Sequence, residues 1–125
     1  MSKAFHGLTQ SFRAALRGIL VAFKSERTFR VMVGVGLAVL ALVVTLPLAA
    51  WERVALLLLT GAILVLELVN SMVERLVDLL KPRLSAYVGD VKDLMAGAVL
   101  VASLFAAALA LLILLPHLPT LFAQF

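Results

Sequence analysis

The sequence contains no cysteine and few charged residues. The missing thiols exclude disulfide bonds, thiolate nucleophiles and thiolate metal ligands, so a bound metal must use oxygen ligands or the two histidines, His6 and His117. Only 14% of the residues are charged, 64% are hydrophobic, and the mean hydropathy is +1.15. This composition excludes an ordinary soluble protein and predicts an integral membrane protein. The 125 residues form one small domain, 1–125, with no room for a separate soluble catalytic domain.

Three apolar segments reach the length of about 20 residues that is needed to cross a bilayer core about 30 Å thick. Residues 31–50 and 94–115 contain no charge, whereas the middle segment, 54–73, contains Glu67 and Asn70 and continues as a helical pattern to residue 80. Residues 4–24 form an amphipathic pattern, with aromatic and basic side chains on different faces. The sequence therefore predicts an all-α membrane protein with three transmembrane helices behind an N-terminal surface helix.

Basic residues are concentrated before the first span and between the second and third spans. By the positive-inside rule, the N-terminus and residues 75–93 face the cytoplasm and the C-terminus faces outward. The net charge of +4 therefore indicates orientation rather than nucleic-acid binding. Because the first apolar run begins only after about 30 residues, a cleavable signal peptide is not expected.

A stripe of polar side chains runs along the second half of the middle helix. At 100° per residue, five side chains share this helical stripe: Glu67, Asn70, Ser71, Glu74 and Asp78. The apolar residues around them are expected to point away from it, namely Leu66, Val69, Val73, Leu76 and Val77. A carboxylate at the centre of a membrane helix costs about 2.5 to 3.5 kcal/mol, so the stripe predicts a polar functional site.

The predicted topology brings most of the acidic residues to the cytoplasmic side. Magnesium usually takes one or two protein carboxylates and completes its shell with water and phosphate, so Glu26 and Glu74 would suffice as ligands. Lys92 would balance phosphate charge. Glu67, deeper in the span, is suited to accept a proton from a hydroxyl group. These residues predict a magnesium–phosphate site that acts on a membrane alcohol.

Other interpretations of the same residues stay open. Glu67 also suits helix packing or an ion path, and Asn70 suits hydrogen bonding between helices. Asp78 suits pairing with one of three nearby basic residues, Arg75, Lys81 or Arg83. The alternative function is a non-catalytic, helix-packing or ion-conducting oligomer in which Glu67 and Glu74 line a polar path.

Turn-forming residues separate the helices. Pro82 ends the second helix, Gly89 is expected in the connection before the third, and Pro116 and Pro119 are expected to end the third. The two histidines have no ligand spacing, so neither is assigned a role.

In combination, these motifs resemble the prokaryotic diacylglycerol kinase and undecaprenol kinase family over about residues 11–115. The resemblance is carried by Glu-x-x-Asn-x-x-x-Glu-x-x-x-Asp at residues 67–78, by Lys92-Asp93, and by the motifs Ser-Glu-Arg-Thr-Phe-Arg at 25–30 and Ala-Gly-Ala-Val at 96–99. It implies a homotrimeric lipid kinase of the bacterial inner membrane, with composite active sites between subunits.

The resemblance also implies a role for each site residue. Glu67 stands where the family has its catalytic base, Glu26 and Glu74 where it binds metal and nucleotide, and Lys92 and Asp93 where it contacts nucleotide; Asn70 and Asp78 match its polar stripe. The implied reaction uses ATP and Mg²⁺ to phosphorylate diacylglycerol or undecaprenol, giving phosphatidic acid or undecaprenyl phosphate. Ser85 and Gly89 replace a histidine and a lysine that are usual in the family, which affects the expected nucleotide affinity.

Overall fold

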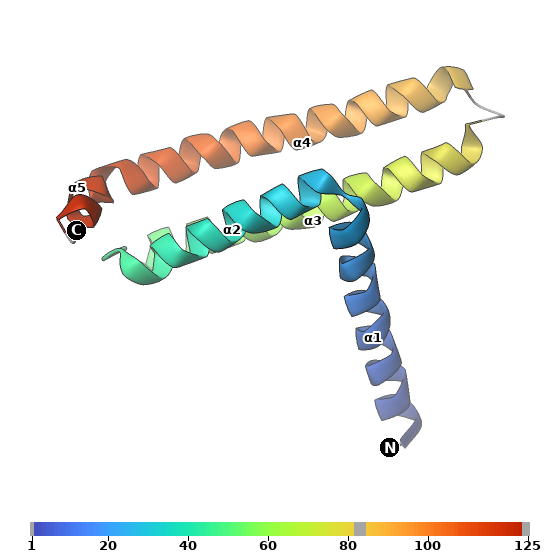
Figure 1. The fold of residues 1–125 in the computed structure, drawn as a ribbon, viewed down its shortest axis with the longest axis horizontal. Coiled ribbons are helices and arrows are strands. Elements are labelled where there is room, and N and C mark those ends of the chain that lie inside the picture. The colour runs from blue at the N-terminus through green and yellow to red at the C-terminus, as the bar shows by residue number, and fades with distance from the viewer. Residues whose placement is uncertain (1, 82–84, 124–125) are drawn as a thin grey trace.

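The chain folds as a helical bundle with a projecting N-terminal helix. The computed structural model describes residues 2–81 and 85–123, and these residues contain no β-strand. The helices are α1 (Ser2–Ser25), α2 (Arg27–Thr45), α3 (Ala50–Leu80), α4 (Ser85–Leu114), the 3₁₀ turn η1 (Leu115–His117) and α5 (Leu118–Phe122). α3 packs against both α2 and α4, whereas α1 points away from these helices (Figure 1).

Within the described residues, three helical segments are long and apolar enough to cross a membrane: Arg27–Thr45, Ala50–Leu80 and Ala86–Phe122. This finding confirms the predicted all-α membrane fold. The largest differences from the expected helix bounds are at two places. α2 ends at Thr45 rather than at residue 50, and α4 begins at Ser85 rather than near residue 94, so Gly89 lies inside α4 and not in a connection. A single glycine costs only about 1 kcal/mol in a helix, and the buried Val88 beside it helps to anchor this turn.

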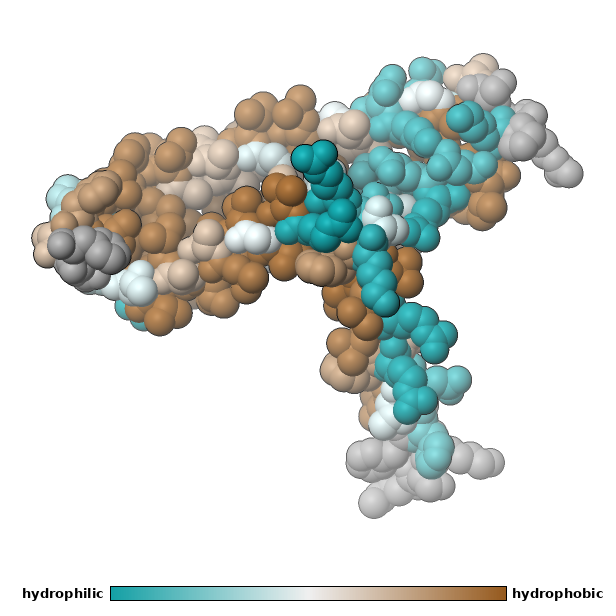
Figure 2. Space-filling model, viewed as in Figure 1, coloured by the Kyte–Doolittle hydropathy of each residue, from teal (hydrophilic) through white to brown (hydrophobic). Residues whose placement is uncertain are grey.

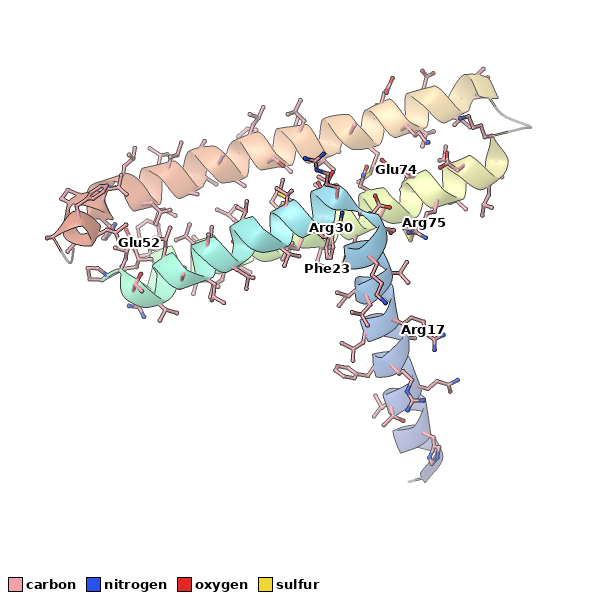
Figure 3. All side chains as sticks on the ribbon, in the orientation of Figure 1. Arg17, Phe23, Arg30, Glu52, Glu74 and Arg75 are labelled. Atoms are coloured by element: carbon pink, nitrogen blue, oxygen red, sulfur yellow. The ribbon has the colours of Figure 1, made fainter. Side chains whose placement is uncertain are left out.

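The junction between α1 and α2 is a sharp elbow at one residue. Glu26 has an extended backbone, with φ −109° and ψ 112°. Arg30 lies one turn into α2 and donates from Nη1 to the carbonyl oxygens of Phe23 (2.9 Å) and Lys24 (3.0 Å). These carbonyls belong to the last turn of α1, where helical partners are missing, so Arg30 caps α1 and fixes the elbow (Figure 3).

The side chains of residues 6–21 on α1 are all exposed. Phe12 and Leu16 are among them, so the apolar face of the helix has no cover within the chain. Figure 2 shows hydrophilic residues along one side of this helix and hydrophobic residues along another. This two-sided surface is typical of a helix that lies in a membrane interface.

α2 and α3 approach closely at a glycine. A Cβ atom placed on Gly36 would lie 3.0 Å from Cγ2 of Thr60. Beyond this contact, at the end of the bundle distant from the elbow, five buried side chains form the hydrophobic core: Val43, Leu46, Leu48, Leu56 and Ile113.

A contact between His117 and Glu52 joins η1, which follows α4, to the start of α3 beside this core. Nε2 of His117 lies 3.6 Å from Oε2 of Glu52, and the two side chains are only 19% and 13% exposed. The same Glu52 oxygen accepts a hydrogen bond from the backbone N–H of Ala49 (2.8 Å), and Nδ1 of His117 lies 3.0 Å from the carbonyl oxygen of Ile113. His117, which had no role in the sequence-based prediction, therefore holds two helix ends together.

We expect His117→Ala to destabilise the bundle without changing the polar end of the molecule. Removing one partner of a largely buried pair should lower the free energy of unfolding by about 1 to 3 kcal/mol. Denaturant unfolding of the purified protein in detergent measures this loss. Gln10→Ala, on the exposed part of α1, is the control; equal stability of the two variants would contradict a role for the pair.

Candidate functional site

Polar residues gather at the end of the bundle where α3 and α4 are joined (Figure 2). Arg30, Glu74 and Arg75 lie near one another where the elbow meets α3, whereas Glu52 lies at the opposite end of the bundle (Figure 3). The candidate site is therefore built from the elbow, the second half of α3 and the first turns of α4.

Glu67 is the most buried charged residue of the described chain, with 3% of its surface exposed. It lies on the inward face of α3 together with Ser71, which is 6% exposed. The two positions are four residues apart, so they stack on the same side of the helix. The sequence correctly placed a carboxylate and a hydroxyl on one buried face.

The polar stripe does not run straight to the end of α3. Asn70 donates from Nδ2 to Oε1 of Glu74 (3.3 Å), which keeps these two side chains together. One turn later, Val77 is buried and Asp78 is exposed. The expectation that Val77 points away was wrong, because the apolar packing of this turn takes Val77 inward and leaves Asp78 at the surface.

Arg75 connects α3 to the elbow. Its Nη2 atom donates to Oγ of Ser25 (2.6 Å) and lies 3.8 Å from Oε1 of Glu26. This contact brings Glu26 to the part of α3 that carries Glu74. The sequence missed it, because nothing local indicates that residues so far apart along the chain will meet.

The charges at this end of the bundle act on one another. The carboxylates of Glu26 and Glu74 are close enough to repel a negative charge on Glu67. Glu74 also attracts Lys92 on α4. The structure therefore brings four of the expected site residues into one region: Glu26, Glu67, Glu74 and Lys92.

Lys92 and Asp78 form an ion pair across the connection between α3 and α4. Nζ of Lys92 lies 2.6 Å from Oδ1 of Asp78. The alternative in which Asp78 pairs with a basic residue is thus correct in kind, but the partner is Lys92. The pair holds the Lys92 side chain toward α3, on the side of Glu74.

Asp93 is not brought into this region within one chain. It lies on the exposed surface of α4, where it lines a shallow groove with Asp90 and Gly97. Gly89 is also exposed, and a Cβ atom placed on it would meet nothing within 4 Å. The side chain of Ser85 lies outside the described residues. The difference between Lys92 and Asp93 follows from the helix, since adjacent positions are turned about 100° apart.

The carboxylates fit a divalent cation that is only partly held by protein. Among the described residues there is no group of three or more acidic or histidine side chains arranged to bind a metal. Magnesium at a phosphate site usually needs only one or two protein carboxylates, because water and phosphate oxygens supply the rest. Glu26 and Glu74 are both partly exposed and match this requirement.

Comparison with known proteins identifies a family and two relatives that this chain resembles. The family described as prokaryotic diacylglycerol kinase matches residues 13–114. A diacylglycerol kinase of Synechocystis sp. is 36% identical over 115 residues, which cover 91% of this chain and 66% of that protein. An undecaprenol kinase of Bacillus subtilis is 35% identical over 109 residues, which cover 87% of this chain and 89% of that protein. The chain thus spans slightly less than two thirds of the first relative and most of the second.

Proposed function

The chain belongs to the prokaryotic diacylglycerol kinase family, a family of lipid kinases, and from this premise we propose that it transfers the γ-phosphate of ATP to the hydroxyl of a membrane lipid. The acceptor is diacylglycerol or undecaprenol, the lipids named for its two relatives. The observation that supports this proposal most is the nearly buried Glu67 near Glu26 and Glu74, with Lys92 close to Glu74.

Glu67 acts as the general base in this proposal. Its carboxylate takes the proton of the lipid hydroxyl as the hydroxyl oxygen bonds to the γ-phosphorus. The bond between the γ-phosphorus and the β–γ bridging oxygen breaks, and ADP leaves. Because Glu67 is only 3% exposed, bulk water is kept from the reacting hydroxyl, which limits hydrolysis of ATP.

Glu26 and Glu74 bind Mg²⁺, which neutralises phosphate charge when bound. Asn70 orients Glu74 through the hydrogen bond between their side chains. Lys92, positioned by Asp78, stabilises negative charge on the transferred phosphoryl group. Arg75 competes with the metal for Glu26, since the guanidinium lies 3.8 Å from that carboxylate.

The lipid enters through the cleft between α1 and α3. This cleft has a volume of about 530 Å³, and its walls include Gly18 and Ile19 of α1 and Leu68 and Met72 of α3. Such apolar walls suit hydrocarbon chains, and the exposed apolar face of α1 rests in the cytoplasmic interface as the lid of the cleft. By the positive-inside rule, this end of the bundle and the N-terminus face the cytoplasm, and the C-terminus faces outward.

The active unit is a homotrimer with shared sites. α4 has few buried residues and presents a groove of small side chains, including Gly97, Ala98 and Ala102, of the kind that lets membrane helices pack closely. Asp93 lies on the same face, so a second copy that packs there would receive it. In this arrangement Asp93 contacts the nucleotide bound by the neighbouring subunit.

Purified protein in lipid, supplied with labelled ATP and Mg²⁺, tests the proposal directly. Diacylglycerol and undecaprenol are offered in separate reactions, and labelled lipid is separated from ATP by extraction. We expect transfer to at least one of them. Folded protein that transfers phosphate to neither would overturn the proposal and favour the non-catalytic alternative.

A further inference from the structure

An apolar cavity lies between the three helices of the bundle, away from the polar cluster. Its volume is about 290 Å³, and α2, α3 and α4 all contribute to its walls. The principal lining residues are Gly36, Val39, Leu56, Ile63, Ala106 and Ala110. Thr60 and Ser103 also line it, and the Thr60 hydroxyl donates to the carbonyl oxygen of Leu56 (2.8 Å), so Thr60 offers no free hydrogen to a ligand. The cavity is therefore chemically suited to hydrocarbon.

The cavity shares a face of α3 with Glu67. Leu56, Thr60, Ile63 and Glu67 are separated by four, three and four residues, the spacing of a single helical face. The cavity reaches Ile63, and at 1.5 Å per residue Glu67 follows about 6 Å further along the axis. The Glu67 carboxylate thus lies beyond one end of the apolar cavity.

The order of these features matches the orientation of a membrane lipid. Glu67 lies on the side of the polar end of the bundle, and the cavity extends from it toward the apolar middle of α3. A lipid whose hydroxyl lies at Glu67 has its hydrocarbon chain on the same side of Glu67 as the cavity, because that hydrocarbon chain points toward the centre of the bilayer. The hydrocarbon chain of the lipid and the cavity therefore lie on the same side of the lipid hydroxyl.

Small residues keep the cavity open. Gly36 of α2 and Ala106, Ala107 and Ala110 of α4 all line the space. Val35 and Ala107, which also line the space, are exposed, so it opens on the surface of the bundle and is accessible to membrane hydrocarbon. Its volume is at the lower end of the range of about 300 to 1,000 Å³ found for small-ligand pockets, which suits part of a single chain.

We propose that this cavity is a subsite for the acceptor lipid, and that it holds the part of one hydrocarbon chain nearest to the hydroxyl. The inference rests on the proposed lipid kinase function and adds a specificity element to it. The chain anchors the hydroxyl at Glu67, while the remaining hydrocarbon leaves into the membrane through the open side of the cavity, past Val35 and Ala107. Acceptors are then selected by the shape of the chain next to the hydroxyl.

Filling the cavity tests this inference. Ala106→Leu and Ala110→Leu each add a branched side chain to the cavity wall, and Ala108→Leu makes the same change at an exposed position outside it. Kinetics are measured with whichever of undecaprenol and diacylglycerol the wild-type protein phosphorylates. We expect KM for the lipid, as a mole fraction, to rise about 10-fold or more in the two cavity variants, since a misplaced methylene in a fitted pocket costs 10-fold or more. KM for ATP and the Ala108→Leu control should keep wild-type values.

Stability provides the second measurement. If the cavity is only a packing void, leucine at residue 106 or 110 should raise the thermal unfolding temperature and leave the lipid KM unchanged, which would overturn the inference. If a side chain of a second copy fills the cavity, both variants should lose the oligomer before they lose lipid affinity, and this result would also overturn the inference.

Photolabelling of the wild-type protein keeps the test independent of variant folding and of turnover. An acceptor analogue with a diazirine close to its hydroxyl should label the segment of α4 that contains Ser103 and Ala106, and unlabelled acceptor should displace it. Equal displacement by phosphatidylglycerol would indicate a general lipid site and overturn the inference. Wild-type protein that phosphorylates neither acceptor contradicts the proposed function, whereas active wild-type protein that labels elsewhere contradicts only the subsite.

Discussion

Replacing Glu67 by glutamine should reduce phosphate transfer to the lipid by about 100-fold or more, because a positioned general base contributes about 10²- to 10⁴-fold to the rate. Glutamine has almost the same shape as glutamate and cannot take the proton of the hydroxyl. The residue is 3% exposed, so a neutral amide there should not weaken the fold. The rate of labelled lipid formation at saturating ATP measures the effect, and unfolding of the same sample shows that the variant is folded.

Glu52→Gln is the matched control. It makes the same chemical change on the same helix, but at the opposite end of the bundle (Figure 3). Because it loses its charge next to His117, a small loss of stability is expected, whereas the rate per folded molecule should stay at the wild-type level. Nucleotide binding should also persist in Glu67→Gln, since this residue does not bind nucleotide in the proposed mechanism. Full activity in Glu67→Gln would show that another group accepts the proton.

The membrane spans could be predicted because their signal is local. A run of about 20 apolar residues has few other stable environments, and proline and charge mark where it ends. The start of α4 could not be predicted in this way. Asp90, Lys92 and Asp93 end the apolar run, but they do not end the helix, since charged side chains can extend into water from the exposed turns of a helix.

Part of the candidate site could also be predicted from the sequence. The burial of Glu67 follows from its place in the helical pattern of a span, and the contact between Asn70 and Glu74 follows from their four-residue spacing. The contacts of Arg75 with the elbow and of Lys92 with Asp78 depend on how two helices meet. That geometry is set by side-chain packing along the whole interface, which no single motif encodes.

His117 illustrates the same limit. On the sequence it is a single histidine between two prolines, with no acidic residue nearby. Its partner Glu52 becomes a neighbour only because α4 runs back along α3 and brings the end of the chain to the start of that helix (Figure 1). The pair is therefore a consequence of the topology.

Removing a metal ligand should produce a loss of activity that depends on the Mg²⁺ concentration. We expect Glu74→Gln to raise the Mg²⁺ concentration needed for half-maximal transfer by about 10-fold or more, because two unit charges 4 Å apart attract by about 1 to 4 kcal/mol in environments between water and a protein surface. High Mg²⁺ should restore part of the rate, unlike in Glu67→Gln. Binding of Mn²⁺, followed by its paramagnetic resonance signal, should weaken in parallel. A rate that falls without any change in metal dependence would remove Glu74 from the metal site.

Arg75→Gln should change the Mg²⁺ requirement for phosphate transfer in the opposite direction to Glu74→Gln. The guanidinium lies 3.8 Å from Glu26 and competes with a cation for that carboxylate. Exposed ion pairs contribute about 0.2 to 1 kcal/mol, so removing the competitor should lower the Mg²⁺ requirement by up to about 5-fold. Arg75→Lys keeps the charge and should stay near the wild-type requirement. A change of opposite sign in Glu74→Gln and Arg75→Gln separates metal binding from general damage to the elbow, because a structural defect would weaken metal binding in both variants.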